Sequence, residues 1–269
     1  MFLKIRSLFQ STYLQSEQES KDYIRGNTKP DTKIMVLMIT VAFSVVMVRY
    51  FGDTLYLLSF LYWTGATSLY LFLGNLFLKS SSAGFYSLLW WVSLVIFFYF
   101  LVPVLIVKLW WKERLRDYGF RLNGAFKDYW LYLLMLVVML PLVLYFSKSQ
   151  AFLDRYPFYK PSATESLFPK FLIWELFYFV HFIAVEFLFR GFMVHGTKRR
   201  FGFYSVFVMM LPYCMVHFGK PFPETMAAIL AGLVLGMVSL KSKSILLGVA
   251  IHYTVAITMD LCALWHLRG

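Results

Sequence analysis

The chain has 269 residues, and 60% of them are hydrophobic, which gives a mean hydropathy of +0.65. This composition leaves too little polar surface to coat water-soluble domains, so a soluble globular protein is excluded. The net charge of +12 does not indicate a nucleic-acid partner, because Lys and Arg lie in short connectors between apolar segments. Lipid headgroups and the rules of membrane insertion account for such residues. We therefore expect an all-α protein, a polytopic bundle of transmembrane helices.

Residues 1–33 form a polar N-terminal region. They carry positive charge but no uninterrupted apolar stretch before a small-residue cleavage site, so we expect no removable signal peptide. Phe2, Ile5, Phe9 and Tyr13 recur at helical spacing. This pattern permits a helix lying on the membrane surface, and a flexible polar tail is the alternative.

Apolar segments long enough to cross roughly 30 Å of hydrocarbon follow this region. We expect eight spans, at 34–50, 54–78, 83–107, 129–146, 170–195, 203–217, 224–240 and 245–266. The first is the weakest, because its uncharged core runs only from Ile34 to Val48, and whether it crosses fully stays open. We divide the chain into the N-terminal region, the spans and basic aromatic connector of 34–128, and a helical core at 129–269.

The connectors give further information about the position of the chain in a membrane. Residues 108–127 are basic and aromatic, which predicts an interfacial segment with Trp110 and Trp111 at headgroup level. The long polar break at 147–170 is either a lid or a surface loop. With eight spans, Lys and Arg divide almost evenly between the two sides, so the orientation stays open.

Charged residues inside membrane spans are costly and therefore informative about function. The candidates are Glu175, His181, Glu186, Arg190, His217 and His252. Glu186 and Arg190 lie four residues apart on one helical face, which predicts an ion pair. The pair is either a structural neutralisation or part of a site. His217 precedes a Pro-containing break and His252 lies in an apolar run, where burial requires a polar partner.

Other residues in the spans have simpler explanations. Glu175 precedes Glu186 by about three turns, roughly 16 Å along the axis, so it cannot join the same small site. For His181 and His195 we expect interface or core roles without partners at helical spacing. Cys214 and Cys262 lie in apolar runs and predict buried free thiols. A run of small residues predicts a helix-packing face. It consists of Ala228, Gly232 and Gly236.

The order of these motifs resembles the CPBP family, which comprises the type II CAAX prenyl endopeptidases and the Abi-type bacteriocin-processing proteins. The resemblance covers about residues 170–260. The family motifs are Glu-Glu-x-x-x-Arg, Phe-x-x-x-His and His-x-x-x-Asn or Asp. They match this sequence at Glu186 and Arg190, at His217 with Tyr213 in place of Phe, and at His252.

Two positions depart from the family pattern. Val185 stands where the first glutamate is expected, and Ala256 replaces the final Asn or Asp. In the family scheme, the first glutamate and the second-motif histidine activate a water, while the third-motif histidine and Asn stabilise the oxyanion. Valine cannot accept a proton and alanine side chains cannot donate a hydrogen bond. Such losses cost about 10²–10⁴ for a general base and about 10²–10³ for an oxyanion donor.

The resemblance implies an intramembrane endopeptidase that acts on a membrane-associated protein or peptide. In this interpretation Glu186 polarises water, His217 shares the proton, His252 stabilises the oxyanion and Arg190 orients Glu186. The alternative is a catalytically impaired pseudoprotease that acts as a membrane scaffold, immunity factor or partner subunit. A transporter is a third class, but no paired Gly- or Pro-broken segments indicate inverted repeats.

We expect no cofactor, and the lesser alternative is zinc held by Glu186, His217 and His252. The sequence has no close ligand pair such as His-x-x-x-His to support zinc. The expected surroundings are the lipid bilayer, with the protein as a multi-pass component of a prokaryotic inner membrane.

Overall fold

The computed structural model describes residues 2–27, 29–126, 128–161 and 166–268, and within these ranges the chain is helical without strands. The expected all-α, polytopic helical bundle is confirmed. Six helical runs in the described part are long and apolar enough to cross a membrane. They are α2 (Thr32–Phe51); the run of α5 (Ala83–Val95), η2 (Ile96–Leu101), α6 (Val102–Leu105) and η3 (Ile106–Trp110); α7 (Tyr129–Phe146); the run of α9 (Lys170–Glu186), η5 (Phe187–His195), α10 (Gly196–Phe201), η6 (Gly202–Tyr204) and α11 (Ser205–Met215); α12 (Phe222–Ser242); and α13 (Leu246–Arg268).

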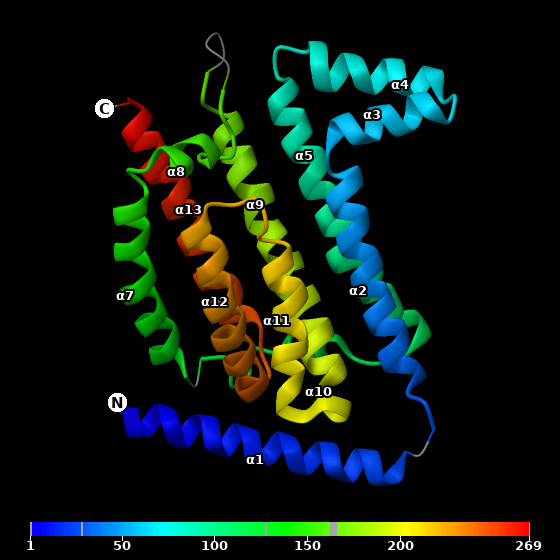
Figure 1. Ribbon diagram of the computed structural model, residues 1–269, viewed down its shortest axis with the longest axis vertical. Helices are drawn as coiled ribbons and strands as arrows, with labels where there is room; N and C mark the ends of the chain where they lie inside the picture. The colour runs from blue at the N-terminus through cyan, green and yellow to red at the C-terminus, as the bar shows by residue number, and fades with distance from the viewer. Residues whose placement is uncertain (1, 28, 127, 162–165, 269) are drawn as a thin grey trace.

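The N-terminal region is a single helix, α1 (Phe2–Gly26), which lies across one end of the bundle (Figure 1). Leu8, Thr12, Ser16 and Ser20 recur every four residues and are buried against the bundle. The helix packs on α10, η6 and α12, and Ser20 donates a hydrogen bond to the carbonyl oxygen of Arg200 at 3.0 Å. Of the two alternatives for this region, the structure therefore shows the helix.

The expected span over 54–78 is wrong. This stretch is broken into α3 (Thr54–Trp63), α4 (Thr67–Gly74) and η1 (Asn75–Lys79). Asp53 caps α3 by accepting a hydrogen bond from the backbone N–H of Leu55 at 2.9 Å, and Gly65, with φ of +76°, lies in the turn before α4. A ten-residue helix is about 15 Å long, too short to cross the hydrocarbon. The two helices lie across the end of the bundle opposite α1 (Figure 1).

The expected sixth span, 203–217, is shorter than predicted, because α11 covers only Ser205–Met215. The chain turns back at Gly202, with φ of +54°, and α11 then runs beside η5 and α12 (Figure 1).

The predicted packing face on α12 is confirmed, since a Cβ at Gly232 would lie 3.1 Å from Cδ1 of Tyr213. A Cβ at Gly236 would lie 2.7 Å from Cγ1 of Val206, so glycine permits the close approach of α11.

The polar break between α7 and α9 packs against the bundle through hydrogen bonds to α12 and α13. It contains α8 (Gln150–Arg155), and the hydroxyl of Tyr156 donates to Glu224 of α12 at 2.7 Å. The backbone N–H of Phe158 donates to Asp260 of α13 at 3.2 Å. This segment therefore covers the ends of α12 and α13 that point away from α1.

The main hydrophobic core surrounds η5, a helical segment with widened, π-type turns. Phe187, Leu188, Phe189 and Phe192 have no exposed surface. Cys214 and Cys262 are free thiols, as predicted, but both are partly exposed and not fully buried. The core thus places η5 at the centre of the bundle, where it holds the polar residues described below.

Candidate functional site

Glu186 is the last residue of α9 and has no exposed surface. Its Oε1 accepts a hydrogen bond from Nη1 of Arg190, one turn further along the chain, at 3.0 Å. Arg190 is equally buried, so each charge has its counter-charge within the core. The ion pair expected from the spacing of these two residues is present.

His252 joins this pair from α13. Its Nδ1 lies 3.0 Å from Oε1 of Glu186, the oxygen that also binds Arg190. Because a carboxylate only accepts hydrogen bonds, Nδ1 carries the proton and Nε2 is left as an acceptor. The His252 side chain is 18% exposed, while that of Glu186 is 1% exposed, so the imidazole is the accessible member.

Gly248 allows α13 to approach this closely. It lies one helical turn before His252, and a Cβ at this position would be 2.6 Å from Oε2 of Glu186. A side chain there would displace the carboxylate or the helix. Sequence reasoning missed this glycine, although a glycine four residues before a buried polar residue in an apolar helix is a usable signal for close packing.

His217 follows α11 and meets the cluster through Tyr213. Its Nδ1 donates to the carbonyl oxygen of Tyr213 at 2.8 Å, which again leaves Nε2 as an acceptor. The Tyr213 ring lies 4.7 Å from the His217 ring and 6.3 Å from the His252 ring, between ring centroids. The guanidinium carbon of Arg190 lies 3.8 Å from the centre of the same ring.

The structure therefore gathers Glu186, Arg190, His217 and His252 around the ring of Tyr213. Three of them are in direct contact, and His217 is connected through the tyrosine. Their catalytic roles stay predictions, because proximity alone does not establish turnover. In the sequence, Tyr213 stands only as a substitute for the family's Phe, whereas in the structure it contacts Arg190, His217 and His252.

Val185 and Ala256 occupy the two positions that depart from the family pattern, and both pack in apolar surroundings. Val185 is 7% exposed and Ala256 is 5% exposed, each within a hydrophobic cluster. A cavity of about 180 Å³ lies between α9 and α13, and apolar side chains line it. They are Phe120, Phe179, Ile183, Leu246, Val249 and Ala250.

A family comparison covers this part of the chain. Residues 167–258 match the family model described as type II CAAX prenyl endopeptidase Rce1-like. The chain carries an Rce1-like segment. The match confirms the resemblance drawn from the sequence, is consistent with a CPBP family member, and includes all four site residues. No match was found among curated proteins, and none among solved structures.

The described residues offer no donor set for the zinc alternative. No group of three or more His, Cys, Asp or Glu side chains in the described ranges lies close enough together to hold a metal ion. In the Rce1-like segment, Glu186 is already bound to Arg190 and His252 through one oxygen, and its other oxygen faces Gly248.

A second buried polar pair, which sequence reasoning missed, lies at the end of the Rce1-like segment that faces α8. Glu175 of α9 and Asp260 of α13 are both buried there, and Oε1 of Glu175 has no hydrogen-bond partner among the described residues. Tyr253 donates to Glu175 at 3.3 Å, and Asp260 accepts from Nε1 of Trp174 at 3.2 Å and from the N–H of Phe158. Asp260 is an acid inside an apolar span, the same signal that had singled out Glu175.

The two remaining histidines of α9 and η5 lie in the core. His181 Nδ1 has no hydrogen-bond partner among the described residues, and its ring lies 4.9 Å from that of Trp91. His195 does have a partner at helical spacing, contrary to expectation, since its Nδ1 lies 3.5 Å from Nζ of Lys198. Its Nε2 also lies 3.2 Å from the hydroxyl of Ser239. Because Ser239 comes from α12, helical spacing within one segment could not reveal this contact.

Proposed function

We propose that this integral, multi-pass membrane protein is a CAAX-protease-like endopeptidase that hydrolyses a peptide bond of a membrane-associated protein or peptide. The observation that carries the proposal is the shared oxygen of Glu186, which binds His252 and Arg190 within an Rce1-like segment. An imidazole held by a buried carboxylate is the arrangement of a general base in hydrolytic enzymes.

The contacts suggest a division of roles that differs from the simplest expectation. Oε1 of Glu186 accepts hydrogen bonds from both Arg190 and His252, while Oε2, beside Gly248, has no hydrogen-bond partner among the described residues. Glu186 instead orients His252 and stabilises the imidazolium that forms when Nε2 takes a proton from the attacking water. The water oxygen bonds to the peptide carbonyl carbon to give a tetrahedral intermediate. His252 then gives the same proton to the amide nitrogen as the C–N bond breaks, which releases the amine and the carboxylic acid.

His217 and Arg190 support this reaction. With Nδ1 donating to the Tyr213 carbonyl, Nε2 of His217 is a second acceptor that can hold the water in place. Arg190 fixes the carboxylate of Glu186 and supplies positive charge near the carbonyl oxygen as it becomes negative. The side chain of Ala256 cannot donate a hydrogen bond to the carbonyl oxygen. We therefore expect slower turnover than in a protein that has Asn at this position of the third family motif.

A second candidate is a pseudoprotease, favoured by the apolar packing of Val185 and Ala256. In this case the Glu186 network is structural, and the protein is a membrane scaffold, immunity factor or partner subunit. The two candidates make opposite predictions about turnover.

The test uses the purified full chain in liposomes with a fluorescently labelled membrane peptide. Wild type is compared with Glu186→Gln and His217→Ala at equal protein content, and His266→Ala serves as a control histidine outside the cluster. We expect a loss of at least about 10²-fold in the first two variants and no loss in the control. Equal turnover in all four proteins would remove the peptidase proposal and leave the pseudoprotease.

A further inference from the structure

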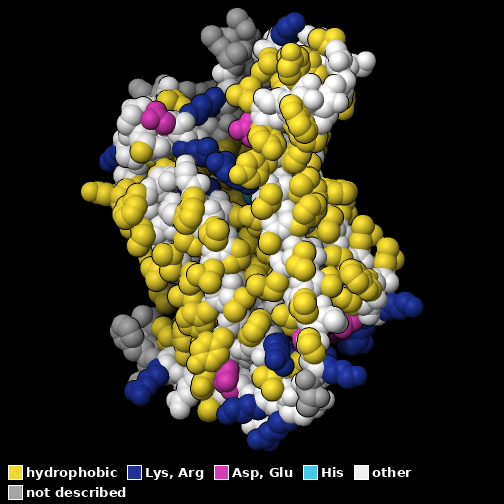
Figure 2. Space-filling view, turned by 45° about the vertical axis from the view of Figure 1, so that its right-hand side comes forward, with side chains coloured by type: hydrophobic (Ala, Val, Ile, Leu, Met, Phe, Trp, Pro, Cys, Tyr) yellow, Lys and Arg dark blue, Asp and Glu magenta, His cyan; other side chains and the backbone are white. Residues whose placement is uncertain are grey.

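The basic residues of this protein concentrate at one end of the bundle. The α1 end holds α1 itself, the connector between η3 and α7, α10, and the end of α12 (Figure 1). Each of these segments carries several Lys or Arg residues, including the consecutive run Lys198–Arg200. Figure 2 shows Lys and Arg side chains gathered around this lower end of the molecule.

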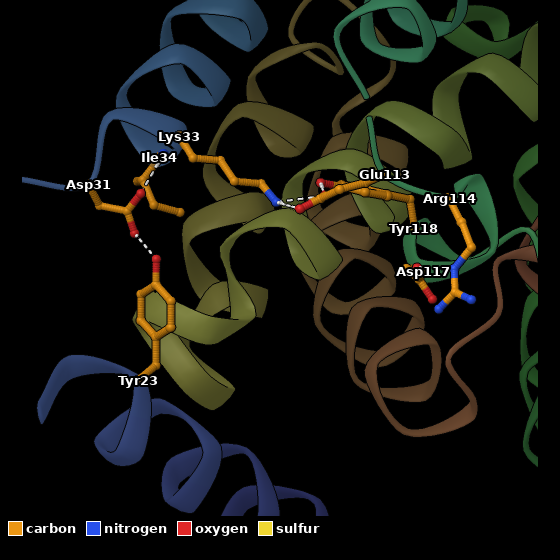
Figure 3. A network of polar contacts seen from close by, with 8 residues as sticks. All are labelled: Tyr23, Asp31, Lys33, Ile34, Glu113, Arg114, Asp117 and Tyr118. Carbon is orange, nitrogen blue, oxygen red and sulfur yellow. Dashed lines mark hydrogen bonds and ion pairs between the residues drawn. The ribbon is translucent and has the colours of Figure 1, made fainter. Parts of the chain in front are cut away.

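Polar contacts tie these segments into one surface. Lys33 at the start of α2 contacts Glu113 of the connector at 2.7 Å, and Tyr118 donates a hydrogen bond to the same carboxylate (Figure 3). Tyr23 of α1 donates to Asp31 at 2.8 Å, which links α1 to the start of α2 (Figure 3). The α1 end is therefore a fixed arrangement of helix ends and not a set of independent loops.

The opposite end has half as many Lys and Arg residues in its described part. The connection from α2 to α5 carries Arg49 and Lys79, and the α11–α12 connection carries Lys220. Four more lie from the end of α7 to the start of α9, and Arg268 is the last residue of α13. Because α3 and α4 do not cross, both ends of this pair stay on the same side, and Figure 1 places the C-terminal end of α13 there as well.

Lys and Arg in short connections are retained on the cytoplasmic side of a membrane. The distribution in this fold therefore places the α1 end in the cytoplasm. The anionic lipids of the inner leaflet add favourable contacts for the same residues.

The polar site is closed toward the α1 end. The Phe187 ring, next to Glu186, lies 5.1 Å from that of Phe120 of the connector, and the Phe192 ring stacks on Trp111 at 5.5 Å, between ring centroids. Both phenylalanines have no exposed surface. Packed aromatic rings thus separate Glu186 from the basic surface.

The site lies close to the surface on the other side. His217 comes two residues after the end of α11, and the next residue, Phe218, is 66% exposed. Thr225 of α12 donates to the His217 carbonyl at 3.0 Å, which holds this turn at the start of α12. The upper part of the molecule in Figure 2 is hollowed between its two halves, with Lys and Arg side chains beside the hollow.

We propose that the site opens to the non-cytoplasmic side of the membrane, so that its substrate is a polypeptide segment exposed on that side. The inference of a substrate rests on the proposed peptidase function, whereas the direction of the opening rests on charge and packing alone. The relevant substrates are then exported or membrane-spanning polypeptides, approached from their non-cytoplasmic portion.

Cysteine labelling in intact bacterial cells tests the direction. The full chain, with Cys214 and Cys262 replaced by Ser, carries one new cysteine at a time, as Gln10→Cys on α1, Ser81→Cys beside α5, or Phe218→Cys. All three positions are exposed. A membrane-impermeant maleimide is expected to label Ser81→Cys and Phe218→Cys in intact cells, and Gln10→Cys only after permeabilisation.

A C-terminal alkaline phosphatase fusion gives an independent measurement, since that enzyme folds only outside the cytoplasm, and we expect it to be active. Labelling of Gln10→Cys in intact cells, with Phe218→Cys protected until permeabilisation, would overturn the proposal. Failure of the peptidase is seen separately, because the labelling pattern does not depend on turnover. In right-side-out vesicles, cleavage of externally added peptide is expected to equal cleavage in permeabilised vesicles.

Discussion

Oε1 of Glu186 lies 3.0 Å from Nη1 of Arg190 and 3.0 Å from Nδ1 of His252. A single carboxylate oxygen thus holds a guanidinium from its own helix and an imidazole from α13, in a part of the core without water-exposed charge. Removal of the carboxylate leaves a buried cation without its counter-charge, which is more costly than loss of the ion pair as a whole.

We therefore expect Glu186→Gln to lower the free energy of unfolding by about 3–5 kcal/mol. The double variant Glu186→Gln/Arg190→Met is expected to recover part of this loss, because the unpaired charge is gone. Thermal or denaturant unfolding in detergent micelles measures both. If the double variant were no more stable than the single one, the guanidinium would not be the source of the cost.

Gly248→Ala tests the close approach of α13 to Glu186. The added Cβ would lie 2.6 Å from Oε2, so either the carboxylate or the helix must move. We expect the hydrogen bond to His252 to be disturbed and turnover to fall by about 10²-fold, as for a misplaced catalytic group. Peptide cleavage at matched protein content gives the measurement.

Gly84→Ala is the matched control for this substitution. Gly84 also lies in a helix, α5, but a Cβ there would have no atom within 4 Å. Alanine is the better helix former, so this variant should be neutral or slightly more stable. Equal activity of the two alanine variants would show that the space beside Glu186 does not matter.

The parts of this fold that follow from short-range geometry could be predicted from the sequence. The Glu186–Arg190 pair is set by the 3.6-residue helical period, and most long apolar segments became membrane-length helices. The family pattern then directed attention to His217 and His252. These predictions needed no knowledge of how distant segments meet.

Features that depend on tertiary contacts could not be predicted in this way. The 54–78 stretch is apolar throughout, and only the Asp53 cap and the turn at Gly65 fold it back on itself. Counting this stretch as a crossing assigned every later connector to the opposite side, and this produced the even division of basic residues. The hydrogen bond from Trp174 to Asp260 likewise depends on the contact between α9 and α13.

The second polar pair makes its own prediction about stability. Asp260 accepts hydrogen bonds from the indole N–H of Trp174 and from the backbone N–H of Phe158, and it has no exposed surface. Asp260→Ala leaves these two buried donors unsatisfied, at about 1–3 kcal/mol each. Asp260→Asn keeps one acceptor oxygen, so a smaller loss is expected. Unfolding experiments in detergent should rank wild type, Asn and Ala in that order, and an Ala variant as stable as Asn would contradict the role of these hydrogen bonds.

Glu113 gives a prediction about pH at the α1 end. Burial alone would raise the pKa of this carboxyl group, but hydrogen bonds from Lys33 and Tyr118 and the charge of Lys33 outweigh it and lower the pKa below its ordinary value of 4.5. A carboxyl group whose pKa is lower in the folded protein stabilises the fold at pH values above its unfolded pKa. This contribution is lost as the pH falls through the folded pKa.

We therefore expect the network of Lys33, Glu113 and Tyr118 to loosen as the pH falls below about 4.5, the ordinary pKa of the carboxyl group. Hydrogen exchange at the start of α2 and in the connector should then accelerate in wild type. Glu113→Gln should exchange faster already at neutral pH and lose most of the pH dependence. Glu19→Gln, whose carboxylate accepts a hydrogen bond from Gln15 of its own helix at 3.2 Å, should behave as wild type. The effect should be modest and weaker at high salt, because both Lys33 and Glu113 are partly exposed. Unchanged pH dependence in Glu113→Gln would show that another group controls the α1 end.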